Sequence, residues 1–292
     1  MQVTVHAPAK INLTLDIVGI REDGYHLLES VFQSVSIYDT IVATPAAEGD
    51  ISLTVTGGVC DCPVEVNTAY KATKVFFDAT GIRSGVHLLL TKRIPQQAGM
   101  GGGSADAAGV LWALDALFDT HLTAEQLCQM GARIGADVPF CVVGGTKFVT
   151  GIGDGLADWG AMPDCYIVVA QPKEGISTAA AYAAVDKATI TRHPDHEVVK
   201  TALAAGDLHA LCGQAVNVFD EATEMAGVRD IRRRMDAFAP LCSQMTGSGS
   251  CVFAVFEDED AAKACVAELK KEYPTAFVCK PCDGVVIEKA SP

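Results

Sequence analysis

The sequence predicts an α+β chain that folds in two lobes. Alternating polar and apolar residues, typical of strands, dominate the start of the chain, and apolar residues at helical spacing follow them. Beyond Gly144 and Gly145 this succession restarts. Antiparallel strands with helices interspersed on one side are typical of α+β folds. Because glycine, aspartate and proline interrupt the pattern over 154–163, we expect an N-terminal domain over 1–158 and a C-terminal domain over 159–292.

In the first domain, residue periodicity and turn residues predict both strands and helices. Period-two alternation predicts strands over 2–7, 11–17, 30–38, 50–56 and 88–91, with a polar turn at 19–24. Apolar residues at helical spacing predict helices over 69–80, 104–118 and 123–130. Thr123 suits the cap of the last helix, because Gln126 stands three residues later as a capping-box partner.

The second domain is read in the same way. Strands are expected over 165–170, 250–256 and 275–279, the first of them fully apolar. Helices are expected over 178–185, 194–205, 208–211, 230–237 and 258–271.

The charge balance excludes some classes of partner. Lysine and arginine number 22 and aspartate and glutamate 36, a net charge of −14, whereas a general nucleic-acid binder needs a basic surface. A local basic pocket for one phosphorylated metabolite remains compatible with that charge. No apolar run approaches the roughly 18 residues of a membrane helix, and no basic stretch followed by an apolar one marks a signal peptide. We expect a soluble, cytoplasmic monomer or homodimer with a small-molecule partner and neither nucleic acid nor membrane.

The cysteines do not form a recognisable framework. There are 11, an odd number, scattered through the chain. The two close pairs are Cys60 with Cys62 and Cys279 with Cys282, whereas a zinc site needs four ligands at paired spacings. We expect reduced thiols that pack as small hydrophobic side chains.

A glycine-rich segment is the strongest functional signal. It contains Pro95, Gln96, Gln97, Ala98, Gly99, Met100, Gly101, Gly102, Gly103, Ser104 and Ala105. Glycines let a ligand approach the backbone, and the helix that begins behind them turns free N–H groups and its positive dipole end toward that ligand. The segment fits neither the Walker A loop nor the dinucleotide fingerprint. A tight turn between helix and sheet would need only one glycine, so the cluster predicts a phosphate site.

Two further segments accompany this loop. Lys10 stands in Ala-Pro-Ala-Lys-Ile-Asn-Leu near the N-terminus, and Gly247 and Ser248 stand in Thr-Gly-Ser-Gly-Ser near the C-terminus. Together the three segments resemble, in order and across most of the chain, the three motifs of the GHMP small-molecule kinases. The resemblance implies the two-lobed GHMP kinase fold, with an N-terminal lobe like the second domain of ribosomal protein S5 and a ferredoxin-like C-terminal lobe. It also implies ATP and Mg²⁺.

A fourth block narrows the resemblance. Arg-Glu-Asp-Gly-Tyr-His, residues 21–26, is similar to a block in the branch that phosphorylates the 2-hydroxyl of 4-diphosphocytidyl-2-C-methyl-D-erythritol in the non-mevalonate isoprenoid pathway. The Gly-Gly-Gly-Ser loop and the stretch 135–140 match that branch too. Met100 and Ala105 stand where the branch usually has leucine and serine, so one hydroxyl contact to phosphate is expected to be missing.

The resemblance assigns the catalytic roles. Asp137 is implied to be the base that takes the proton of the acceptor hydroxyl. Lys10 beside it would hold that carboxylate ionised and lower the proton affinity of the acceptor. The structural alternatives are an aspartate that ends a helix or forms a turn and a lysine that merely extends its ammonium group to solvent.

Further residues are implied to bind the two ligands. Tyr25 and His26 suit a cytosine site, because an aromatic face stacks on a base and histidine can bond its edge. Tyr182 is implied to close the other side of the base, or it packs on Leu203. The remaining expected substrate contacts are Asn12, Gly247 and Ser248. Asn67 is implied to lie on the adenine side, with helix capping an equally good explanation; Asp106 is read as structural.

Two rival functions remain. Another GHMP kinase, of the homoserine or mevalonate type, would lack the Gly24-Tyr25-His26 block together with the triple glycine. A non-catalytic nucleotide-binding regulator on the same scaffold would have lost Lys10 or Asp137, and both are present. No magnesium ligand is assigned, because Mg²⁺ usually keeps waters and binds through substrate phosphates.

Overall fold

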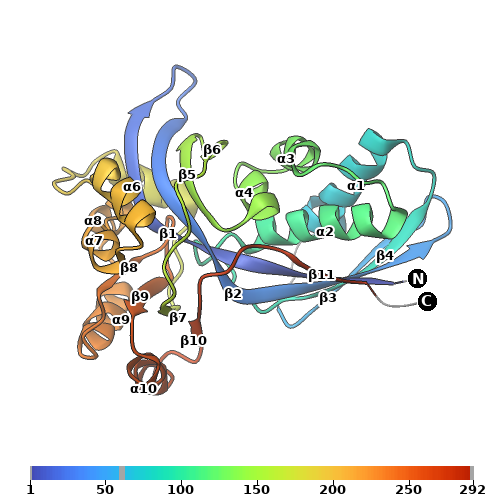
Figure 1. The fold of residues 1–292 in the computed structure, drawn as a ribbon. Helices are drawn as coiled ribbons and strands as arrows, with labels where there is room; N and C mark the ends of the chain where they lie inside the picture. The colour runs from blue at the N-terminus through green and yellow to red at the C-terminus, as the bar shows by residue number, and fades with distance from the viewer. Residues whose placement is uncertain (1, 59–62, 290–292) are drawn as a thin grey trace.

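The computed structural model describes residues 2–58 and 63–289 and contains two sheets (Figure 1). The larger sheet has the strand order β11-β1-β2-β4-β3, and β5, which carries β6 at its edge, also pairs with β2. Its strands are β1 (Val3–Ile20), β2 (His26–Ala46), β3 (Ile51–Thr56), β4 (Gly85–Thr91), β5 (Thr146–Gly151), β6 (Gly155–Ala157) and β11 (Val286–Lys289). Only β3 and β4 pair parallel among the described strands.

The long β1–β2 ribbon positions the first motif. Sequence alternation predicted two strands here, but one strand continues past Pro8, with a register shift between Pro8 and Ala9. Such a bulge accommodates a residue that has no N–H to donate. Because neighbouring strand residues face opposite sides of a sheet, Ile11 packs in the core while Lys10 and Asn12 point to the other face.

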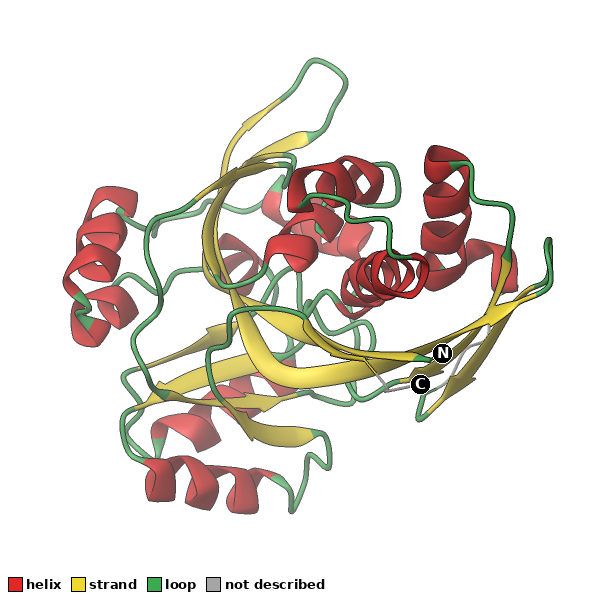
Figure 2. Ribbon diagram, turned by 45° about the vertical axis from the view of Figure 1, so that its right-hand side comes forward, coloured by secondary structure: helices red, strands yellow, loops and turns green. Residues whose placement is uncertain are grey.

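Helices cover one face of the larger sheet (Figure 2). They are α1 (Thr68–Thr80), α2 (Gly102–Phe118), α3 (Ala124–Ala132) and α4 (Val138–Val143), with a short 3₁₀ helix, η1 (Val64–Val66), before α1. The apolar helix α2 packs directly on the sheet, where a Cβ at Gly109 would lie 2.6 Å from Ile41 Cδ1. The predicted capping box of Thr123 and Gln126 is confirmed.

The smaller sheet forms the second lobe. Its order is β10-β7-β9-β8, all antiparallel, which is the strand order of a ferredoxin-like unit. Its elements are β7 (Tyr166–Ala170), α5 (Thr178–Val185), α6 (His196–Ala205), α7 (Leu208–Gly213), α8 (Val218–Ala222), α9 (Ala226–Asp236), β8 (Cys242–Met245), β9 (Val252–Phe256), α10 (Glu259–Leu269) and β10 (Ala276–Cys279). Ile167 and Val169 pack toward the first lobe, whereas Val168 and Ala170 pack in a second core cluster. Burial on both faces therefore explains why β7 is wholly apolar.

The last described strand, β11, returns to the larger sheet. It pairs antiparallel with β1, with Val3 opposite Lys289, so the first and last described strands lie side by side (Figure 1). The C-terminal residues thus complete the sheet that the N-terminal residues begin. The division of the chain at 158/159 stays a prediction.

Nine cysteines lie in the described residues, all as free thiols and most of them buried. Burial raises the pKa of the Cys265 thiol to about 12, which favours its neutral, apolar form. Cys60 and Cys62 lie outside the described residues. Over the described parts of the chain, no helix combines the length and the apolar character that crossing a bilayer requires.

Candidate active site

The three sequence motifs meet in space through backbone contacts. The N–H of Lys10 in β1 donates to the carbonyl of Met100 in the glycine loop at 3.0 Å. The N–H of Asn12 donates to the hydroxyl of Thr246 at 2.9 Å. The loop is joined to the third motif in turn, since the N–H of Cys251 donates to the carbonyl of Ala98 at 3.2 Å. Residues distant in the sequence therefore share one site.

Two glycines make this meeting possible. Gly99 has a φ of +74°, and a Cβ there would lie 2.2 Å from the carbonyl oxygen of Thr246. Gly247 has a φ of +58°, and its Cβ would lie 2.8 Å from the carbonyl oxygen of Gly99. Both positions need left-handed backbone and both lack room for a side chain. The two loops can therefore touch backbone to backbone only with glycine at these places.

One cavity, of about 500 Å³, lies along the glycine loop. Loop residues 95–104 form one side, and Val55, Val66 and Leu90 contribute an apolar surface. Helix α2 begins here with Gly101 as its N-cap, so its first N–H groups and positive dipole end face this cavity. Ala105 does not line the cavity, because its side chain is buried in the core. The serine hydroxyl that Ala105 replaces would therefore not face the cavity.

Asn67 fits both explanations offered for it. Its side chain caps α1 by accepting from the N–H of Ala69 at 2.9 Å. The same residue also lines the cavity along the glycine loop.

A buried charge cluster that sequence reasoning missed lies beside this cavity. The Nζ atom of Lys92 contacts the carboxyl groups of Asp39 and Asp106, and the N–H of Ile94 donates to Asp39 at 2.9 Å. Burial raises the pKa of Asp106 to about 8, and Asp39 adds to that shift while Lys92 opposes it. Asp106 thus pairs with Lys92 instead of acting as a first-turn residue of α2, and it also lines the cavity. Lys92 stands shortly before the glycine loop in the sequence, and this position was the one signal that could have pointed to the cluster. Asp39 lies in β2, and nothing in the sequence around it pointed to the cluster.

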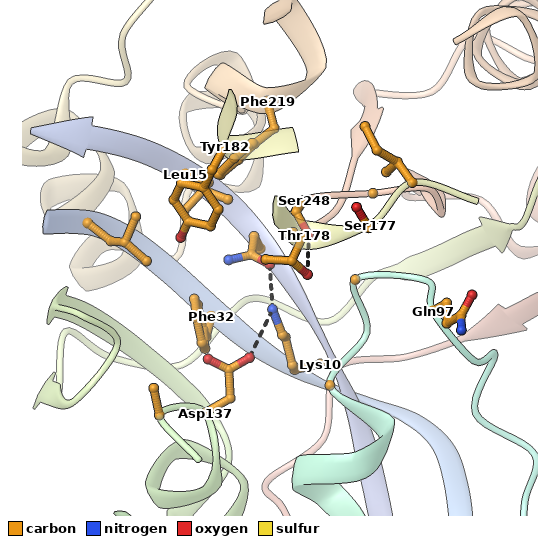
Figure 3. A pocket seen from close by; sticks show the side chains of 18 of the residues that line it. Lys10, Leu15, Phe32, Gln97, Asp137, Ser177, Thr178, Tyr182, Phe219 and Ser248 are labelled. Carbon is orange, nitrogen blue, oxygen red and sulfur yellow. Dashed lines mark hydrogen bonds and ion pairs between the residues drawn. The ribbon is translucent and has the colours of Figure 1, made fainter. Parts of the chain in front are cut away.

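The predicted catalytic pair is assembled. The Nζ atom of Lys10 lies 3.6 Å from Asp137 Oδ2 and donates to Asn12 Oδ1 at 2.8 Å (Figure 3). Asn12 in turn donates to the Ser30 hydroxyl at 3.0 Å, and the ammonium lies 4.4 Å from the centre of the Phe32 ring. The Lys10 side chain is only 5% exposed. Its ammonium is therefore held in place and cannot extend to solvent.

Asp137 lies in the turn before α4, but its side chain does not cap that helix. It stands at the N-cap position of α4, yet its side chain accepts no hydrogen bond from the first turn of that helix, all of which is described. The side chain is 33% exposed, so the carboxylate is open to a ligand. A helix-ending or capping role does not explain this residue.

A second cavity, of about 720 Å³, contains the pair. Lys10, Asn12, Asp137, Gly247 and Ser248 are among the residues that line it. It shares Gln97, Gly99 and Gly101 with the first cavity, so the glycine loop is their common wall. One ligand on each side of that loop would place two reacting groups next to each other.

The predicted aromatic residues are only partly gathered at this cavity. Tyr182 lines it, with its ring against Phe219 (ring centres 4.9 Å apart) and His26 (4.6 Å). Leu203, the packing partner considered for Tyr182, belongs to the other core cluster. His26 contacts Tyr182 but is not among the residues that line the cavity, and Tyr25 is 59% exposed on the β1–β2 turn.

Two family models match the chain, the GHMP kinases N terminal domain over residues 67–145 and the GHMP kinases C terminal over residues 200–275. A 4-diphosphocytidyl-2-C-methyl-D-erythritol kinase of Clostridium tetani is 39% identical over 279 residues, which cover 94% of this chain and 99% of the relative. A kinase of the same name from Brevibacillus brevis is 40% identical over 89% of each chain.

Solved structures show the same similarity. A crystal structure of a 4-(cytidine 5'-diphospho)-2C-methyl-D-erythritol kinase superposes with a TM-score of 0.81 at 32% identity, covering 95% of this chain and 98% of that one. A homoserine kinase from Cytophaga hutchinsonii has a TM-score of 0.75 at 18% identity, with 98% and 97% covered. At that identity the second match shows the fold alone.

Proposed function

The chain belongs to the 4-diphosphocytidyl-2-C-methyl-D-erythritol kinases of the GHMP kinase family, and we propose how its residues perform the transfer. The enzyme moves a phosphoryl group from ATP to the 2-hydroxyl of the cytidine-diphosphate-linked methylerythritol. This transfer requires little covalent chemistry from the protein, which must position the two substrates and stabilise charge. The predicted two-lobed fold and family are confirmed.

ATP occupies the cavity along the glycine loop. Its phosphates lie against the backbone N–H groups of the loop and the N-terminus of α2, where the helix dipole favours negative charge. Its base lies toward the apolar surface of Val55, Val66 and Leu90.

The acceptor occupies the second cavity, with its hydroxyl at Asp137. The Asp137 carboxylate takes the hydroxyl proton as the phosphoryl group moves, and the Lys10 ammonium lies 3.6 Å from it. The observation that carries this assignment is the Lys10–Asp137 pair at a cavity that shares the glycine loop with the first.

We propose Mg²⁺ as the companion of ATP, neutralising phosphate charge when bound. Among the described residues no three histidine, cysteine, aspartate or glutamate side chains cluster as metal ligands. A Mg²⁺ ion that is held mainly by phosphate oxygens and water does not need such a cluster of protein ligands. We place the enzyme in the cytoplasm, where its nucleotide substrates are available.

A substrate panel tests the assignment against the rival kinases. ADP release would be measured with the cytidine-diphosphate-linked methylerythritol, homoserine and mevalonate at equal concentrations. Release with the first alone supports the proposal, whereas preferential release with either of the others contradicts it. Binding of ATP with no release for any acceptor would favour the regulator.

A further inference from the structure

One hydrogen bond between a histidine and a carboxylate joins the two lobes next to Tyr182, which lines the substrate cavity. The Nε2 atom of His26, the first residue of β2, lies 2.7 Å from Asp186 Oδ1, just beyond α5. Asp186 is held by the helix, since its N–H donates to the carbonyl of Tyr182 at 3.0 Å. Residues four apart share a helix face, so Tyr182 and Asp186 meet the same imidazole. Tyr182 covers its ring face, and Asp186 binds its edge.

The chemistry of this pair decides what His26 can offer a ligand. A carboxylate has acceptors only, so the Nε2 atom that faces Asp186 carries the proton. In a neutral ring the Nδ1 atom is then an acceptor, and it has no hydrogen-bond partner among the described residues. An acceptor complements the exocyclic amine of cytosine, whereas uracil presents a carbonyl oxygen at that position.

We propose that Asp186 is a positioning residue that selects cytosine over uracil through His26. It fixes both the rotation and the tautomer of the imidazole, so that Nδ1 accepts from the cytosine amine and repels the uracil carbonyl. The inference rests on the proposed function, since base selection matters only for a nucleotide-linked acceptor. Tyr182 lines the substrate cavity and contacts the His26 ring, so the imidazole lies next to the wall of that cavity.

Stability does not account for this pair. The Asp186 side chain is 46% exposed, and contacts of exposed carboxylates contribute little to folding. Asp186 therefore acts on the orientation of His26 more than on the stability of the fold.

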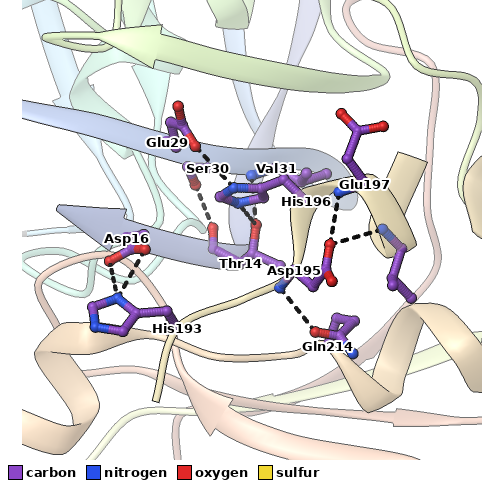
Figure 4. A network of polar contacts seen from close by, with 11 residues as sticks. Thr14, Asp16, Glu29, Ser30, Val31, His193, Asp195, His196, Glu197 and Gln214 are labelled. Carbon is purple, nitrogen blue, oxygen red and sulfur yellow. Dashed lines mark hydrogen bonds and ion pairs between the residues drawn. The ribbon is translucent and has the colours of Figure 1, made fainter. Parts of the chain in front are cut away.

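A second histidine–carboxylate pair that involves β2 provides a matched control. His196, the first residue of α6, pairs through Nδ1 with Glu29 Oε2 at 3.0 Å (Figure 4). The Glu29 side chain is 39% exposed, close to the value for Asp186, and it too joins β2 to the second lobe. Neither Glu29 nor His196 lines the substrate cavity. A Glu29→Gln change therefore perturbs a similar bond without touching the proposed base reader.

The test compares kcat/KM for the cytidine and uridine forms of the substrate in wild type, Asp186→Asn, Asp186→Glu and Glu29→Gln. In Asp186→Asn the introduced amide could face Nε2 with either its oxygen or its NH₂, so the tautomer would no longer be fixed. We expect Asp186→Asn to reduce the cytidine-over-uridine ratio about tenfold or more, mainly through KM for the cytidine form. Asp186→Glu should retain most of the ratio, and Glu29→Gln all of it.

Nitrogen-15 NMR of the imidazole gives a readout independent of activity. The wild type should show His26 protonated on Nε2, and Asp186→Asn should show a mixture of tautomers. An unchanged ratio in Asp186→Asn, or an equal loss in Glu29→Gln, would overturn the inference. So would a wild type that uses both nucleotides equally while remaining a kinase. A wild type inactive on the cytidine form would instead overturn the proposed function.

Discussion

The ammonium of Lys10 lies 3.6 Å from the carboxylate of Asp137, with the lysine almost wholly buried and the aspartate a third exposed. This asymmetry separates their roles. The buried cation is fixed by its bond to Asn12, while the carboxylate is open to the substrate cavity. The geometry therefore places a fixed positive charge beside a carboxylate that an acceptor hydroxyl can reach.

Replacement of Asp137 by asparagine tests the base directly. Asparagine keeps the shape but cannot take the proton, so turnover should fall about 10²–10⁴-fold while ATP affinity stays nearly intact. Steady-state kinetics and calorimetric titration with an ATP analogue measure the two quantities. Near-native turnover in this variant would remove the base assignment.

A side chain at Gly102 should block the nucleotide. A Cβ there would lie 3.2 Å from Ile94 Cγ2 and 3.5 Å from Lys92 Nζ, at the edge of the nucleotide cavity. We expect Gly102→Val to abolish binding of an ATP analogue in calorimetric titration while the protein still melts cooperatively. Gly213→Val is the control, since a Cβ at Gly213 meets no described atom within 4 Å. If the variant lost its cooperative melting transition while the fraction that still folds bound the analogue, the role of the loop would be structural only.

The Lys92 cluster predicts a pH dependence of stability. Burial raises the pKa of Asp106 to about 8, far above the roughly 3.9 of an unfolded aspartate. The folded chain then binds this proton more tightly than the unfolded chain, so the contribution is complete below about pH 4 and is lost as the pH rises through about 8. Asp106→Asn should therefore flatten the fall of Tm between pH 5 and pH 9. If the Tm of the wild type and the Tm of Asp106→Asn changed with pH in parallel, Asp106 would not be the origin of the pH dependence.

Local features of the fold could be predicted from the sequence, and distant pairings could not. The glycine loop and the Thr123 cap depend on neighbouring residues, and both lie where predicted. The return of β11 to β1 depends on the whole fold, so four residues near the C-terminus carried no signal for it. The short helix α4 was missed because six residues around Pro139 are too few to show helical periodicity.

The candidate site shows the same difference between features that depend on neighbouring residues and features that depend on distant ones. Lys10 and Asp137 could be named as candidates because each stands in a motif, and the fold brings them together. Asp39 and Asp186 stand in no motif, and each acquires its partner only when β2 meets another element. Residues that act through long-range contacts are therefore the ones that sequence reasoning omits.

The aromatic residues predict how the substrate base is read. Stacking is worth about 1–3 kcal/mol per base and does not depend on which base is present, so Tyr25→Ala should weaken cytidine and uridine substrates alike. His26→Ala should instead narrow the gap between them, because an unpaired polar edge is what penalises the wrong base. The measurement is kcat/KM for both nucleotide forms. A Tyr25→Ala change that alters the ratio, or a His26→Ala change that does not, would contradict these roles.

Phosphorus NMR of one reaction mixture tests the central claim most directly. The protein would be incubated with ATP, Mg²⁺ and the cytidine-diphosphate-linked methylerythritol, with 2-C-methylerythritol phosphate as the acceptor in a parallel tube. We predict a new phosphomonoester on the 2-hydroxyl of the nucleotide-linked substrate, with ADP formed in equal amount and no comparable product in the second tube. Equal use of the acceptor without a nucleotide, or ADP formed with no phosphomonoester, would contradict the account.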